Sequence, residues 1–147
     1  MRGVPPRSGR LADVPRAVRL AATTARTLPA EARGPRWLRN SWLDVLVHQA
    51  EDLADDLADH VLGGLEQPGV SEAERDRLLH TVRVHLAGNG VIADTAAALY
   101  CHRNTVRHRF NRFHELTGND VRHPESAALI ALALRARGRG AEAKAAP

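Results

Sequence analysis

The chain has 147 residues, of which 44% are hydrophobic and 26% are charged, with a formal net charge of +4 at pH 7. Because only 3% of the residues are aromatic and alanine, leucine and valine dominate the apolar set, we expect an all-α protein rather than a β-sandwich or barrel. A single cysteine and the absence of a run of roughly eighteen apolar residues exclude a disulfide scaffold and a transmembrane helix, so we expect a cytoplasmic protein with no membrane partner.

The N-terminal part of the chain gives a weak helical pattern. Asp13 can cap a helix with Pro15 in its first turn, and Pro29 would end that helix. The stretch from 30 to 40 has no helical period, whereas SWLDVLVHQA at 41–50 resumes an apolar pattern. We therefore expect an additional helical segment before the main domain.

The stretch EDLADDLADHVLGGL predicts an amphipathic helix that begins at Glu51 and ends at Gly63 and Gly64. Aspartates occupy the opposite side of this helix. The predicted apolar stripe consists of Leu53, Leu57 and Val61, flanked by Ala54, Ala58 and Leu62.

A second helix is predicted to begin after Ser71. Glu74 follows Ser71 by three residues, which is the capping-box pattern of a helix N-terminus. Gly88 would end this helix. Its predicted inward residues are Leu78, Leu79, Val82 and Leu86.

Three further helices are predicted in the rest of the chain. A short helix covers Ile92 to Leu99, three residues at 100–102 break it, and a longer helix runs from about Arg103 to Leu116 before Gly118. Pro124 can occupy the first position of a last helix, and GRGAEAKAAP is predicted to be a disordered tail. The residues expected on the buried side of that last helix are Leu129, Ile130, Leu132, Ala133 and Leu134.

The charges are unevenly distributed along the chain. Residues 1–42 hold nine arginines and two acids, residues 43–76 hold ten acids and one arginine, and residues 95–114 hold four arginines and no acid. A basic segment is the electrostatic footprint of nucleic-acid binding, although a basic face is more often merely solvated.

The longer helix has two distinct faces. At 100° per residue, Val106, Phe110 and Phe113 fall together and are predicted to point into the core. The opposite face is polar, basic and rich in hydrogen-bond donors near the helix N-terminus, as a recognition helix requires, because arginine can bind guanine and asparagine can bind adenine. Ala96 lies ten residues before Val106, which is the spacing of the small and apolar contact residues in a helix-turn-helix.

No metal site is expected. His102, His108 and His114 are each six residues apart, which puts successive rings about 120° around a helix and about 9 Å along it, whereas shared ligation needs residues three or four apart. Cys101 is expected to be a small buried residue in the turn. Because the chain also has no nucleophile elbow, P-loop or paired carboxylates, we expect neither an enzyme nor a cofactor.

The segments LLHTVRVHLAGNG, TAAALYCHRNTVRHRFNRFHELTG and PESAALIALALRA together resemble the C-terminal helix-turn-helix domain of the PucR family. This family contains regulators of purine catabolism and sugar-diacid metabolism, and the domain is similar to the Fis-type DNA-binding fold. The most diagnostic piece is HRNTVRHR followed by ELTG. The resemblance implies an all-α helix-turn-helix domain of the Fis-like helical-bundle type. It also implies that the protein binds double-stranded DNA sequence-specifically, controls transcription and is associated with the nucleoid.

The resemblance also implies a set of DNA-contacting residues on the longer helix, which would enter the major groove. Those predicted to face the groove are Arg103, Asn104, Thr105, Arg107 and His108, with Asn111 and Arg112 nearer the DNA backbone. Arg109 lies closer to the core side, where we expect it to pack or to form a salt bridge.

The sequence departs from the pattern of the family at three places. Val91 to Ala93 replace the usual Asn or Ser cap of the short helix, Ala97 replaces a common arginine, and His123 replaces an Asp cap before Pro124. Loss of a cap costs roughly 1 kcal/mol and removes a possible phosphate contact. These departures are expected to affect the affinity for DNA more than the fold. They leave a second interpretation open, in which the chain is a truncated dimerisation or interaction module with weak or lost DNA binding.

The domain organisation follows from the same resemblance. Residues 1–47 resemble the end of the GGDEF-like middle domain of the family and are expected to be partly flexible, residues 48–137 form the helix-turn-helix domain, and residues 138–147 form the tail. We expect a homodimer, with contacts between the helices of residues 41–65. We expect no small-molecule effector site in the residues present, so the chain is either a fragment or a small regulator without a sensor.

Overall fold

The computed structural model describes residues 18, 22 and 42–145, with residues 139–145 described by their backbone only. Within these residues all regular structure is helical and no strand occurs, which confirms the all-α prediction. The chain divides between Gln49 and Ala50 into two units. Apart from two helical residues, the helix predicted after Asp13 lies outside the described residues. The described part of the first unit contains α2 (Trp42–Gln49).

The second unit begins with α3 (Glu51–Leu62), which continues into the short 3-10 helix η3 (Gly63–Glu66). Two acidic residues in the first turn of α3 complement the positive end of the helix dipole. The predicted apolar stripe is wrong in one respect, because Leu53 is 70% exposed. The other residues of the prediction are buried, namely Ala54, Ala58, Val61 and Leu62, except that Leu57 is half-buried. Small alanines allow this face to lie close against α7 (Pro124–Ala145).

Helix α4 (Glu72–Ala87) begins at the predicted cap and ends at Gly88. The Ser71 hydroxyl accepts a hydrogen bond from the Glu74 backbone N–H at 3.2 Å. Leu78, Leu79 and Val82 are buried as predicted, whereas Leu86 is only half-buried. The buried position next to Leu86 is taken by His85, which is 5% exposed.

His85 is buried where α4 meets α5 (Ile92–Ala98) and α6 (Arg103–Thr117). Its ring packs edge-on against Phe110, with ring centroids 4.7 Å apart. Its Nδ1 lies 2.8 Å from the Thr95 hydroxyl, and that hydroxyl donates its proton to the Val91 carbonyl at 2.9 Å. Because the hydroxyl has only one proton, Nδ1 of His85 carries a hydrogen and donates it to Thr95.

Burial lowers the pKa of His85 below its ordinary value of 6.5. Below that pH the unfolded chain binds a proton that the folded chain does not accept. The contribution of His85 to stability is therefore present above the unfolded pKa and is lost as the pH falls from 6.5 to the lower pKa of the folded state. We expect the free energy of unfolding, measured by urea denaturation, to decrease as the pH falls below the ordinary pKa of 6.5. The variant His85→Gln should lose less stability over this interval, and an equal loss in both proteins would contradict the assignment.

The recognition helix predicted from Arg103 to Leu116 is α6, which ends one residue later. Gly118 follows it with φ of +73°, the left-handed conformation that favours glycine at a helix C-terminus. Val106, Phe110 and Phe113 are each at most 1% exposed, which confirms the predicted core face.

Helix α7 begins at Pro124 as predicted but runs to Ala145. The segment expected to be a disordered tail is therefore helical over 138–145, where alanine, glutamate and lysine favour a helix. Ile130, Ala133 and Leu134 are buried and Leu132 is half-buried, whereas Leu129, predicted to be buried, is 37% exposed. None of the helices in the described part of the chain combines the length and apolar character that a membrane span needs.

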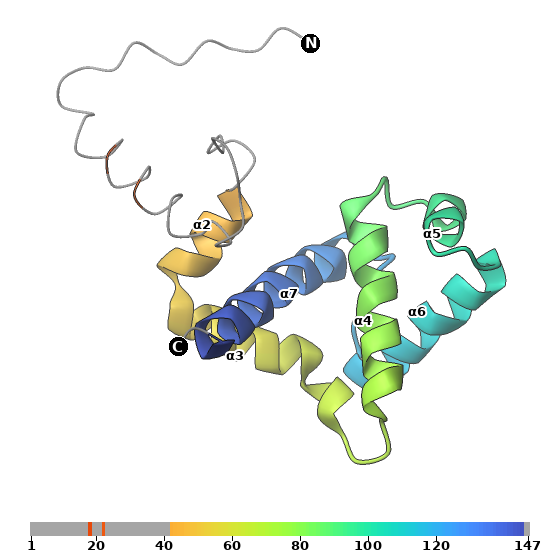
Figure 1. Cartoon of the computed structure of the whole chain (residues 1–147), viewed down its shortest axis with the longest axis horizontal. Coiled ribbons are helices and arrows are strands. Elements are labelled where there is room, and N and C mark those ends of the chain that lie inside the picture. The colour runs from red at the N-terminus through yellow and green to blue at the C-terminus, as the bar shows by residue number, and fades with distance from the viewer. Residues whose placement is uncertain (1–17, 19–21, 23–41, 146–147) are drawn as a thin grey trace, which may run out of the picture. The chain divides into compact units, whose positions relative to one another are not determined.

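Figure 1 shows how the helices of the second unit are arranged. Helices α3 and α7 lie side by side and form its most extensive helix pair. Helix α4 packs against α5, α6 and α7, and η3 packs against α6. Helix α4 thus packs against both α5 and α6.

Candidate nucleic-acid interface

The two helices of the α5–turn–α6 unit are joined by a sharp turn at residues 99–102. The backbone N–H of Cys101 donates to the Ala96 carbonyl at 3.0 Å, and Tyr100 has a positive φ of 50°. Ala96 on α5 and Val106 on α6 are both buried, as their ten-residue spacing predicts. Cys101, which was expected to be buried, is half-buried in the turn.

Helix α6 is capped by a histidine. The Nδ1 of His102 accepts a hydrogen bond from the Asn104 backbone N–H at 3.2 Å, and the His102 carbonyl accepts from the Thr105 N–H at 2.9 Å. This cap could not be predicted from the residue type, because histidine is not among the usual N-cap residues. No acidic residue lies in the first turn, so the positive end of the helix dipole is not neutralised by its own side chains.

The structure places most of the predicted DNA-contacting residues on the exposed face of α6. Arg103, Asn104, Arg107, His108 and Asn111 are exposed, and Thr105 is half-buried. These side chains lie opposite the buried face that fixes α6 to the core. They form one polar and basic surface at the N-terminal part of the helix.

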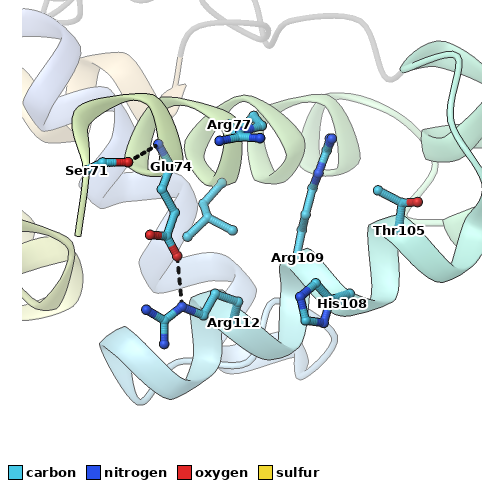
Figure 2. Close-up of a pocket in the computed structure, with 8 residues that line it drawn as sticks. Ser71, Glu74, Arg77, Thr105, His108, Arg109 and Arg112 are labelled. Carbon is cyan, nitrogen blue, oxygen red and sulfur yellow. Dashed lines mark hydrogen bonds and ion pairs between the residues drawn. The ribbon is translucent and has the colours of Figure 1, made fainter. Parts of the chain in front are cut away.

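Arg112 differs from the other predicted contact residues because it is held by an acidic partner. Its Nε donates to a carboxylate oxygen of Glu74 on α4 at 2.8 Å, and its Nη1 lies 3.5 Å from Glu115. The hydrogen bond that Arg112 donates to Glu74 is the main reason that the pKa of Arg112 is raised. Figure 2 shows Arg112 directed toward Glu74 and α4. In this structure Arg112 therefore links two helices.

Arg109 also links α6 to α4. Its Nη1 donates to the Thr81 hydroxyl at 3.1 Å, and that hydroxyl donates to the Arg77 carbonyl at 2.7 Å. Arg109 therefore lies toward the core side of α6, as predicted. Its partner there is the buried Thr81, to which it donates a hydrogen bond, and not an acidic residue.

A shallow groove lies between α4 and α6, and we refer to it as the α4–α6 groove (Figure 2). It is lined by Ser71, the N-cap residue of α4, by Glu74, Arg77 and Leu78 from α4, and by Thr105, His108, Arg109 and Arg112 from α6. The exposed side chain of Arg77 was not predicted to belong to the site. The residues near Arg77 in the sequence do not predict this position. Only the packing of α4 on α6 brings Arg77 to the groove.

The histidines of this region are dispersed around α6, as their spacing predicts. Across the described residues, no three His, Cys, Asp or Glu side chains come together in an arrangement that could hold a metal ion.

Comparisons with known proteins support the helix-turn-helix geometry. Residues 78–136 match the family described as the PucR C-terminal helix-turn-helix domain. The chain is 33% identical over 106 residues to the purine catabolism regulatory protein of Bacillus subtilis (strain 168). This match covers 67% of the chain but only 20% of the length of that relative. A crystal structure of a regulator of polyketide synthase expression from Bifidobacterium adolescentis matches 84% of the chain with a TM-score of 0.51 and 26% identity, over 50% of its own length.

Proposed function

Because residues 78–136 form a PucR C-terminal helix-turn-helix domain, we propose that the chain regulates transcription by binding specific sequences of double-stranded DNA. The observation that carries the proposal is the exposed face of α6. It presents cationic and amide side chains at the positive end of a helix whose opposite face is anchored in the core. This is the arrangement that allows a recognition helix to enter the major groove.

The side chains on this face suggest a division of tasks. Arg103 and Arg107 can each bind the O6 and N7 atoms of guanine, and Asn104 can bind the N6 and N7 atoms of adenine. Asn111 lies two turns further along the helix and is assigned to the DNA backbone. The names of the two related regulators agree with a role in gene control.

Helix-turn-helix proteins commonly bind as symmetric dimers to half-sites about 34 Å apart. We therefore propose a homodimer that places one α6 in each of two successive major grooves. Its contact surface is assigned to residues 41–65, in which Leu53 exposes 70% of its surface.

The variant Arg107→Ala tests the role of α6. Loss of a bidentate base contact costs about 1–3 kcal/mol, so we expect roughly a tenfold or greater increase in the dissociation constant for a duplex selected for tight binding. Fluorescence anisotropy with a labelled duplex over a series of salt concentrations measures this effect. Affinity of the unchanged protein should fall steeply as salt is raised.

The matched control for this experiment is Arg83→Ala. Arg83 is exposed on α4, carries the same charge and lies outside both α6 and the α4–α6 groove. Its removal should leave affinity within about threefold of that of the unchanged protein. Equal losses in the two variants would mean that net charge, and not the face of α6, determines binding.

A second candidate function is an interaction module that has lost DNA binding. Helix α5 has no side-chain cap at Val91, and the pairing of Arg112 with Glu74 and Glu115 reduces the positive charge beside α6. Both features lower the expected affinity for DNA. A protein with no measurable DNA binding at low salt would support this candidate over the first.

A further inference from the structure

The α4–α6 groove collects positive charge beside the face of α6 that is assigned to the DNA bases. We propose that this groove is a second contact site, which binds a backbone phosphate of the DNA with Arg77 and Arg112 as its cations. This proposal rests on the proposed function, and it adds α4, which lies outside the helix-turn-helix, to the DNA-binding surface.

The charges that line the groove favour an anion. Three arginines and one histidine line it, and Glu74 is the only carboxylate among its lining residues. Arg109 is engaged with Thr81. Arg77 donates from Nε to the Ala73 carbonyl of its own helix at 3.3 Å, which leaves its terminal nitrogens for an external acceptor. Arginine can present two such nitrogens to the oxygens of a phosphate.

The position of the groove matches the position of a phosphate row. The major groove is about 12 Å wide, so a helix inserted into it has sugar-phosphate backbone along its flanks. The α4–α6 groove follows one flank of α6, where Thr105 and His108 line it and also belong to the face that is assigned to the DNA bases (Figure 2). A DNA strand bordering the bases read by α6 would therefore pass over Arg77 and Arg112.

Glu74 has a distinct role in this arrangement. Its carboxylate holds Arg112 at 2.8 Å in a partly exposed ion pair, with side-chain exposures of 38% for Arg112 and 30% for Glu74. A phosphate that enters the groove competes with Glu74 for Arg112, and its own charge is repelled by the carboxylate. Glu74 therefore orients Arg112 in the free protein and weakens phosphate binding, so its removal should strengthen DNA binding.

The test uses the full chain and a labelled duplex of arbitrary sequence, because phosphate contacts carry no sequence information. We expect Arg77→Ala to weaken binding roughly threefold to tenfold and to reduce the slope of log affinity against log salt by about one. Arg83→Ala removes the same charge from the same helix outside the groove and should leave the slope unchanged. Glu74→Gln, which keeps the size of the side chain, should strengthen binding severalfold and steepen the slope.

The double variant Glu74→Gln with Arg112→Ala shows whether Glu74 acts through Arg112. The gain from Glu74→Gln should disappear in this background, and circular dichroism melting of each variant establishes that it is folded. If Arg77→Ala and Arg83→Ala behave alike while Arg107→Ala still weakens binding, the groove proposal is wrong and the proposed function stands. If the unchanged protein binds no duplex at low salt, both proposals are wrong.

Discussion

The variant Phe110→Ala is expected to lower the free energy of unfolding by about 3–5 kcal/mol, the usual cost of removing a large aromatic side chain from a packed core. Phe110 is 1% exposed, lies on the inner face of α6 and packs against the ring of His85 on α4. Its truncation leaves a cavity between α6 and α4. Urea denaturation followed by circular dichroism at 222 nm measures the loss.

The matched control for Phe110→Ala is Tyr100→Ala. This substitution also truncates an aromatic side chain, but Tyr100 is 97% exposed in the turn between α5 and α6. We expect a change within about 0.5 kcal/mol at this position. A cost at Phe110 no larger than the cost at Tyr100 would contradict the placement of the inner face of α6 in the core.

The variant Gly64→Ala is expected to lower the free energy of unfolding by about 1–3 kcal/mol, because an added methyl group meets backbone that cannot move aside. A Cβ at Gly64 would lie 1.9 Å from the carbonyl oxygen of Leu116 and 3.2 Å from the Cα of Thr117. Helix η3 therefore contacts the end of α6 so closely that only glycine fits. Thermal unfolding of the variant checks this prediction.

Gly63→Ala is the control for this experiment. No atom lies within 4 Å of a Cβ built on Gly63, and its φ and ψ of −57° and −30° are helical. Alanine at this position should be neutral or should stabilise the protein by about 0.4–1 kcal/mol, because it restricts the unfolded chain. Equal destabilisation by the two neighbouring substitutions would show that the close approach of η3 to α6 is not present in solution.

The features of the fold that could be predicted from the sequence are those encoded locally. The Ser71 cap, the glycine after α6 and the period of Val106, Phe110 and Phe113 each depend on residues within a few positions of one another, and all three predictions are confirmed. Leu53 shows where such reasoning fails, because α3 could bury either its leucine side or its alanine side. The close packing of α7 selected the alanines.

The candidate site shows the same limit. The helical period was enough to predict that Asn104, His108 and Asn111 are exposed opposite the buried face of α6. No period relates Arg112 to Glu74, which lies 38 positions earlier in the chain, or brings Arg77 to the same groove. Such contacts depend on how α4 crosses α6, so the ion pair between Arg112 and Glu74 could not be predicted from the position of Arg112 along its helix.

The central claim, that the N-terminal face of α6 is the DNA-binding surface, is tested most directly by nuclear magnetic resonance. Amide chemical shifts of the isotope-labelled chain are compared before and after a duplex is added at low salt. We expect the largest changes at residues 102–108, with smaller changes along the α4–α6 groove and little change in α3. Changes confined to α3 and α7, or no changes with DNA in excess, would contradict the claim.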